Sequence, residues 1–146
     1  QRQMCIRDRM LRILLKRFII LCTRIAREKF SVSPEREKAF DMVRQFYVLV
    51  DNHFKEKKMV QDYADMLHRS PKTLSNLFTT CGLPSTLRII HERIEAEAKR
   101  LLLYSQKSAK EITEILGFED QATFSRFFKK MTGESVSEYR KREKQE

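Results

Sequence analysis

The sequence is poor in the residues that break helices or form turns. In 146 residues it has only three glycines and three prolines, and it has no tryptophan. A chain with so few of these residues is unlike a fold built from many tight turns. No stretch alternates β-branched and polar residues as a half-buried strand does. Leucine, isoleucine, lysine and glutamate are plentiful instead, so we expect an all-α protein.

Cysteine is scarce as well. Cys5, Cys22 and Cys81 are odd in number, scattered, and without CxxC spacing. This pattern argues against a disulfide framework and favours a reducing cytoplasm. Because Cys22 and Cys81 fall in helical apolar patterns, we expect both to be buried thiols.

Residues typical of catalytic and metal sites are also few. The three histidines, His53, His68 and His91, have no ligand-like spacing with one another or with the cysteines. No Ser/His/Asp order, glycine-rich phosphate loop or pair of carboxylates stands out. The sequence therefore predicts neither an enzyme nor a bound metal or cofactor.

Positive charge is abundant but unevenly distributed. Of the net charge of +10, residues 1–30 carry +7, because they hold nine Lys/Arg against two Asp/Glu. Residues 31–146 carry only +3. A nucleic-acid partner therefore requires that the positive groups of this longer part are gathered on one surface.

Residues 60–78, VQDYADMLHRSPKTLSNLF, have the pattern of two short helices joined by a tight turn. In the first, apolar residues recur at i, i+3, i+4 and i+7 from Val60 to Leu67. Ser70 is suited to cap the second helix, and Pro71 to occupy its first position. We expect Leu74, Leu77 and Phe78 to pack inward, which leaves a polar face outside. This is the logic of a helix-turn-helix unit, although a plain αα-hairpin has a similar pattern.

The same design occurs a second time. Residues 73–78, TLSNLF, match residues 123–128, TFSRFF, at an offset of 50, and the preceding helices match at an offset of 49. The second turn is thus one residue longer. Gly117 fits the left-handed residue that ends a helix, and Asp120 fits the cap of the next.

These residues resemble the C-terminal DNA-binding domain of the AraC/XylS family of bacterial transcription regulators. The resemblance covers about 100 residues, from about Phe40 to Arg142, and the block EITEILGFEDQATFSRFFKKMTG is highly specific. The family usually has Ser-Pro after each recognition helix, where this chain has Ser85-Thr86 and Ser135-Val136. Proline there pre-sets a helix start, so its absence affects those starts more than function.

The resemblance implies two helix-turn-helix subdomains, at 60–80 and 109–130, joined by a long linker helix at 85–104 in a homeodomain-like bundle. This linker is expected to be the longest helix of the DNA-binding part, and Ser85 to be its cap. Capping boxes are expected at Ser108–Glu111 and Ser135–Glu138. The expected buried face of the linker helix comprises Leu87, Ile90, Ile94, Ala98 and Leu101. The expected core stripe of the helix after Pro34 comprises Phe40, Val43, Tyr47, Val50 and Phe54. The charge run Lys55–Lys58 is expected to be solvated.

The N-terminal part is expected to lie outside this domain. Residues 1–9 resemble adapter-derived sequence and are excluded from fold reasoning, and the chain is expected to be a fragment. Residues 10–30 predict an amphipathic helix with a heptad-like stripe, and residues 31–34 a linker before the domain at 35–142. Leu11, Leu15, Phe18, Cys22 and Ile25 form the stripe. In relatives such a helix ends a sensor domain and serves dimerisation, so a homodimer through Met10–Phe30 or packing on a missing sensor is expected. No uncharged run approaches the length of about 20 residues that spans a membrane.

Candidate DNA contacts follow from the outward faces of the two second helices. For base edges the candidates are Lys72, Ser75, Asn76, Gln121, Ser125 and Arg126. For phosphates the candidates are Arg69, Thr79, Thr123, Lys129 and Lys130. Thr73 and Ala122 complete the set. Asn and Gln can pair with adenine, and Arg with guanine, through two hydrogen bonds each.

We therefore expect a sequence-specific binder of double-stranded DNA that regulates transcription, with RNA polymerase as a further partner implied by the resemblance. Two alternatives are left open by the residues. One is a helical protein-interaction module, whose binding would depend only weakly on salt. The other is a membrane-surface protein using the basic helix at 10–30.

Overall fold

The computed structural model describes residue 14, residues 17–22, residue 25 and residues 33–143. The chain divides into two compact parts, Gln1–Lys38 and Ala39–Glu146, with the boundary inside a helix. The described residues of 10–30 are helical and exposed, whereas Leu11 and Leu15 of the predicted stripe lie outside the described residues. No helix of the described part is long and apolar enough to cross a membrane.

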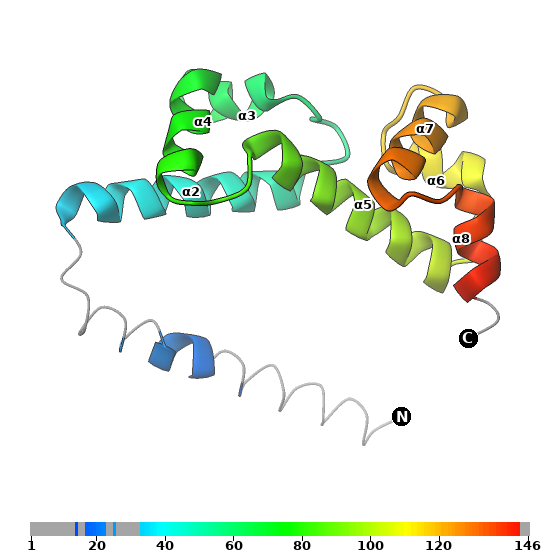
Figure 1. The fold of residues 1–146 in the computed structure, drawn as a ribbon, viewed down its shortest axis with the longest axis horizontal. Coiled ribbons are helices and arrows are strands. Elements are labelled where there is room, and N and C mark those ends of the chain that lie inside the picture. Colours follow the sequence, from blue (N-terminus) through cyan, green and yellow to red (C-terminus); the bar gives the residue numbers. More distant parts are fainter. Residues whose placement is uncertain (1–13, 15–16, 23–24, 26–32, 144–146) are drawn as a thin grey trace. The chain divides into compact units, whose positions relative to one another are not determined.

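Residues 33–143 form helices joined by turns and loops, without a strand, so the prediction of an all-α fold is confirmed (Figure 1). The helices are α2 (Pro34–His53), α3 (Val60–Met66), α4 (Pro71–Thr80), α5 (Thr86–Tyr104), α6 (Ala109–Ile115), α7 (Gln121–Thr132) and α8 (Val136–Glu143). Helices α3 and α4 lie at 60–80, where the first helix-turn-helix was predicted, and α6 and α7 at 109–132, against a prediction of 109–130 for the second. The linker helix α5 is not the longest of these, since α2 has 20 residues and α5 has 19.

Helix starts follow the predicted caps. The hydroxyls of Ser70, Ser85 and Ser108 each accept a backbone N–H three residues on, at 3.1–3.3 Å. At Ser108 the carboxylate of Glu111 accepts the Ser108 N–H in return, which completes a capping box, and Ser135 with Glu138 does the same. Each such cap satisfies donors that a helix start leaves unpaired, and is worth about 1 kcal/mol.

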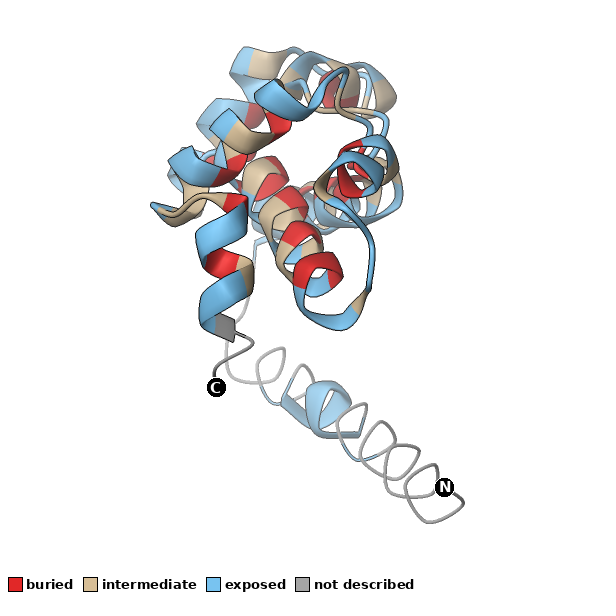
Figure 2. Cartoon of the chain, turned by 90° about the vertical axis from the view of Figure 1, so that its right-hand side faces the viewer, coloured by how far each residue is buried: buried red, intermediate tan, exposed pale blue. Residues whose placement is uncertain are grey.

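The core runs along α5, which packs against helices of both subdomains. Ile90, Ile94, Ala98 and Leu101 are buried as predicted, and Ile89 and Leu102 join them. Figure 2 shows buried residues along the inner sides of the helices, with exposed residues on their outer sides. Leu87, predicted to be buried, is 44% exposed because the buried line of α5 runs instead through Thr86 and Ile90.

The predicted stripe of α2 is partly wrong. Val43, Val50 and Phe54 are buried, but Phe40 and Tyr47 are exposed. Phe46 takes the central place and is fully buried, with its ring centroid 5.0 Å from that of Phe78. One residue corresponds to about 100° of helix rotation, so choosing Tyr47 over Phe46 moves the predicted stripe to the edge of the core.

Two further predictions of burial need correction. Cys22 is exposed, and Cys81 is half-buried. The side chain of Lys58, predicted to be solvated with its neighbours, is half-buried and bonded to backbone carbonyls, because the turn after α2 brings it against the second subdomain. Lys55 and Glu56 are exposed as predicted, whereas Lys57 is half-buried.

Candidate nucleic-acid interface

Helix α4 is fixed by its cap and by two apolar side chains. Leu74 and Phe78 are fully buried, and the Ser70 hydroxyl accepts the Thr73 N–H at 3.1 Å. Pro71 at the first position loses only an N–H that would lack a helical partner. The opposite face is exposed and comprises Lys72, Ser75, Asn76 and Thr79. The structure thus gathers the polar candidates of the first unit on one outward surface.

Helix α7 has the same construction. Phe124 and Phe128 are fully buried, and the Asp120 carboxylate accepts the Thr123 N–H at 2.7 Å. Gln121, Ala122, Arg126 and Lys129 are exposed, and Ser125 is half-buried.

The threonine candidates are engaged within their own helices. The Thr73 hydroxyl lies 2.8 Å from that of Ser70, and the Thr123 hydroxyl donates to Asp120 at 2.9 Å. The Thr79 hydroxyl donates to the Ser75 carbonyl at 2.9 Å. The hydroxyl protons of Thr79 and Thr123 are thus already donated to the Ser75 carbonyl and the Asp120 carboxylate. Each hydroxyl can then only accept a hydrogen bond, whereas a phosphate oxygen needs a donor.

Arg126 is oriented toward the start of α7. Its Nη2 donates to the Thr123 hydroxyl at 3.3 Å. The Thr123 N–H, then the Thr123 hydroxyl and more weakly the Arg126 guanidinium hold the pKa of Asp120 below its usual value. The guanidinium is thereby placed beside the N-terminal turn of α7, the part of a recognition helix that meets base edges.

Positive charge continues into the last turn of α7. Lys129 and Lys130 are both exposed there. Burial lowers the pKa of the His91 imidazole on α5, and the nearby charge of Lys130 lowers it further. The His91 ring packs edge-on against Phe127 at 5.3 Å between centroids. Lys130 follows Phe127 by three residues and therefore lies near the junction of α7 with α5.

Arg69 follows a residue with a left-handed backbone conformation. His68 has a left-handed φ of +52°, and the Arg69 N–H closes the turn on the Ala64 carbonyl at 2.9 Å. Gly117 has φ of +67° at the equivalent place of the second unit, and the Phe118 N–H bonds to the Thr113 carbonyl at 3.0 Å. The two turns thus share one hydrogen-bond pattern. The Arg69 side chain is exposed.

The two helix-turn-helix units, α3–α4 and α6–α7, both pack against α5. The pairs α3–α4 and α6–α7 lie on the same side of that helix (Figure 1). Nineteen residues give α5 a length of about 28 Å, close to the ~34 Å turn of B-DNA. Lys58, before α3, also reaches the Gly117 carbonyl in the turn between α6 and α7, at 2.6 Å. The sequence holds no signal for this contact, because it depends on how two distant turns meet.

A pair of such units, each presenting a capped second helix with a polar outer face, defines a double helix-turn-helix protein of the DNA-binding class. The sequence family described as a helix-turn-helix domain matches residues 63–142, more than half of the chain. The chain belongs to this family in its AraC/XylS form, as the relatives and solved structures also show.

Three similar proteins illustrate the relationship. The uncharacterised HTH-type transcriptional regulator YijO of Escherichia coli is 27% identical over 131 residues, which cover 89% of this chain and 45% of that protein. The arabinose operon regulatory protein of Salmonella typhimurium is 36% identical over 92 residues, 63% of this chain and 31% of that protein. The structure of the C-terminal domain of AraT, a response regulator from Geobacillus stearothermophilus, superimposes with a TM-score of 0.62 at 28% identity, covering 77% of this chain and 88% of that one. The chain spans less than half the length of the curated relatives that it matches.

Proposed function

We propose that this chain is the DNA-reading part of a transcription regulator, and that it binds operator DNA by placing α4 and α7 in two successive major grooves. The observation that carries the proposal is the pair of exposed polar faces on α4 and α7, mounted on the same side of α5. The proposal concerns binding alone, without a catalytic step, in the cytoplasm where bacterial DNA lies. Residues 35–142 are the proposed DNA-binding domain.

In this proposal, base edges are read from the exposed polar positions of both helices. Asn76 and Gln121 offer the amide that pairs with adenine, and Arg126 offers the guanidinium that pairs with guanine. Lys72, Ser75 and Ser125 add single hydrogen bonds, and Ala122 allows close approach to a thymine methyl group. The exposure of most of these side chains supports the assignment.

Phosphate contacts are assigned to the flanking positive groups. Arg69, Lys129 and Lys130 are exposed at the ends of the turns and helices, where they can fix the register of the protein without reading sequence. Thr73, Thr79 and Thr123 are proposed to contribute chiefly by holding the helix starts and faces in place, since their hydroxyls are engaged there.

Selection of duplexes from a random library tests the proposal. We expect enrichment of one sequence with two half-sites about one helical turn apart. Arg126→Ala should cost about 1–3 kcal/mol on that sequence and relax one base position. Lys129→Ala is the matched comparison, because it should weaken all sequences alike and reduce the salt dependence by about one phosphate contact. A folded chain that enriches no sequence, and whose partner binding is insensitive to salt, would instead be a protein-interaction module.

We further propose that the helix predicted at 10–30 mediates self-association, and that the bound protein acts on RNA polymerase. The heptad-like stripe of residues 10–30 supports the first proposal. Leu15→Asp or Phe18→Asp should abolish a dimer, because an unpaired charge would lie in the buried seam. Sedimentation measures this directly, and a parent chain that is monomeric at high concentration would remove the dimer from the proposal.

A further inference from the structure

The two helix-turn-helix units touch each other directly as well as through α5. The contact joins the segment after α2, residues 54–59, to the turn between α6 and α7, 59 residues further along the chain. Lys58 Nζ donates to the Lys55 carbonyl at 2.7 Å and to the Gly117 carbonyl at 2.6 Å. It also lies 5.1 Å from the centroid of the Phe118 ring. We call this the Lys58–Gly117 contact.

Lys58 differs here from an ordinary surface lysine. Its side chain is half-buried, and burial lowers the pKa of its ammonium group. Both of its acceptors are carbonyls just beyond the C-terminal ends of helices, α2 for one and α6 for the other. A helix C-terminus carries partial negative charge, so a cation placed between two of them is stabilised by both.

Gly117 shows how closely the two segments approach. A Cβ atom at this position would lie 2.0 Å from the Lys55 carbonyl oxygen and 3.1 Å from Lys58 Nζ. The first repeat provides an internal comparison, because His68 occupies the equivalent position with a similar left-handed backbone and carries a full side chain. The backbone conformation alone therefore does not require glycine at 117. The approach of the other unit does.

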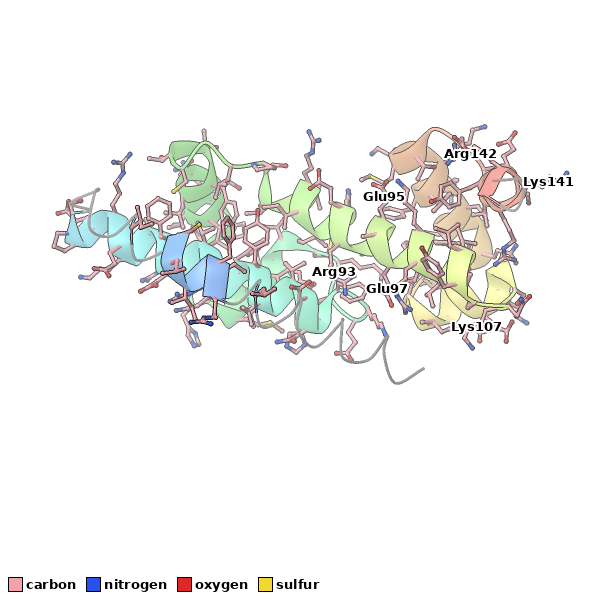
Figure 3. The ribbon with its side chains drawn as sticks, turned by 90° about the horizontal axis from the view of Figure 1, so that it is seen from below. Arg93, Glu95, Glu97, Lys107, Lys141 and Arg142 are labelled. Atoms are coloured by element: carbon pink, nitrogen blue, oxygen red, sulfur yellow. The ribbon has the colours of Figure 1, made fainter. Side chains whose placement is uncertain are left out.

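The segment that carries Lys58 is itself held to α5. Arg93 on α5, labelled in Figure 3, donates to Asp51 near the end of α2 at 2.7 Å. Its guanidinium lies 4.0 Å from the centroid of the Phe54 ring. Arg93 also pairs with Glu97 one turn further along α5, at 3.5 Å. The first unit is thus anchored to the middle of α5, and through Lys58 to the second unit.

Building on the proposed function, we propose that Lys58 and Gly117 are positioning residues that fix the angle and separation of α4 and α7, and so set the spacing of the two half-sites that the chain accepts. Helix α5 packs against helices of both units and so already restrains them. The Lys58–Gly117 contact links the units directly and restricts the motion that α5 still allows, so the penalty for a wrongly spaced operator depends on it.

Lys58→Met tests the proposal, since it keeps most of the length of the side chain and removes the ammonium group. Lys57→Met is the matched control. It removes the same charge one residue away, where Lys57 forms only a partly exposed pair with Asp62 at 3.5 Å. Each variant is measured on the selected operator, on operators with one base pair inserted or deleted between the half-sites, and on a single half-site.

The parent chain and Lys57→Met should lose about tenfold or more in affinity when the spacing changes by one base pair. Lys58→Met should lose clearly less, with its affinity for a single half-site equal to that of Lys57→Met. A folded Lys58→Met chain with the parent's spacing profile would overturn the proposal. A parent chain that selects no sequence would instead overturn the proposed function, which is a different outcome.

A measurement without DNA tests the role of Lys58 independently of the proposed DNA binding. Spin labels at Thr80 on α4 and Lys110 on α6, in a chain with its three cysteines replaced, report the distance between the units. Lys58→Met should broaden this distance distribution, and Lys57→Met should not. An unchanged distribution would overturn the proposal whatever the chain binds. If Lys58→Met does not fold, Gly117→Ala provides the same test from the other side of the contact.

Discussion

Lys130 and His91 show how a single residue can report on a proposed DNA contact. The folded-state pKa of His91 lies below the ordinary value of 6.5, first because of burial and second because of the Lys130 charge. The unfolded chain therefore takes up this proton at a higher pH than the folded one. His91 consequently lowers the stability of the fold as the pH falls through 6.5 and below.

Replacing Lys130 with glutamine should raise the pKa of His91 in the free protein, because one of the two causes of its depression is removed. NMR titration of the imidazole measures this. If Lys130 binds a phosphate in the complex, operator binding should raise the His91 pKa in the parent chain, because the phosphate charge offsets that of Lys130. An unchanged His91 pKa on binding would show that Lys130 lies away from the DNA backbone.

At the scale of the element, the left-handed residues that end helices distinguish the two repeats. His68 has φ of +52° and is the one non-glycine residue with positive φ among the described residues. Gly82 has φ of +67°, and a Cβ atom there would meet nothing within 4 Å. Positive φ costs a residue with a side chain about 1–2 kcal/mol. Substitutions at these positions therefore distinguish the effect of backbone strain on stability from that of steric contact.

His68→Gly should therefore raise the free energy of unfolding, by up to about 1 kcal/mol after the added entropy of the unfolded chain is subtracted. Gly82→Ala should lower it by about 1 kcal/mol through strain alone. Gly117→Ala should lower it more, because the Lys55 carbonyl must also move. Urea unfolding followed by circular dichroism gives the three values. A loss of stability in His68→Gly would show that the histidine side chain makes a contact worth more than the strain.

Elements were easier to predict from the sequence than their packing. Helix starts depend on local chemistry, because each capping side chain accepts the backbone N–H only three residues further on. The caps are Ser70, Ser85, Ser108 and Asp120. The buried faces depended on distant neighbours. Tyr47 and Phe46 are both large and aromatic, and Phe46 is the one that is buried, packed against both Tyr63 and Phe78. The polar faces of α4 and α7 were predicted because burial of Leu74 and Phe124 leaves no other side exposed, whereas the role of Lys58 depends on a contact between distant turns.

At the scale of the whole molecule, α5 sets the separation of the two units along its axis. Inserting one alanine between Ala96 and Glu97 should rotate everything downstream by about 100° and lengthen the helix by about 1.5 Å. Specific affinity should then fall to what one unit provides. Four inserted alanines rotate the downstream part by only about 40° but move it by about 6 Å, so this variant should retain more.

Circular dichroism must first show that both insertion variants are folded, and quantitative binding to the selected operator then compares them. A folded single-insertion variant with undiminished affinity would mean that only one unit reads bases. The first unit would then be the better candidate, because Ser75 and Asn76 form its exposed polar face.

The unlike faces of the two repeats give the proposed complex a direction. Asn76 stands where the second repeat has Arg126, so the two half-sites read by one chain differ in sequence and the operator has no two-fold symmetry. A chain bound to such a site has α4 toward one neighbour on the DNA and α7 toward the other. Reversing the operator on the chromosome, with every contact preserved, would turn the protein's other end toward the promoter.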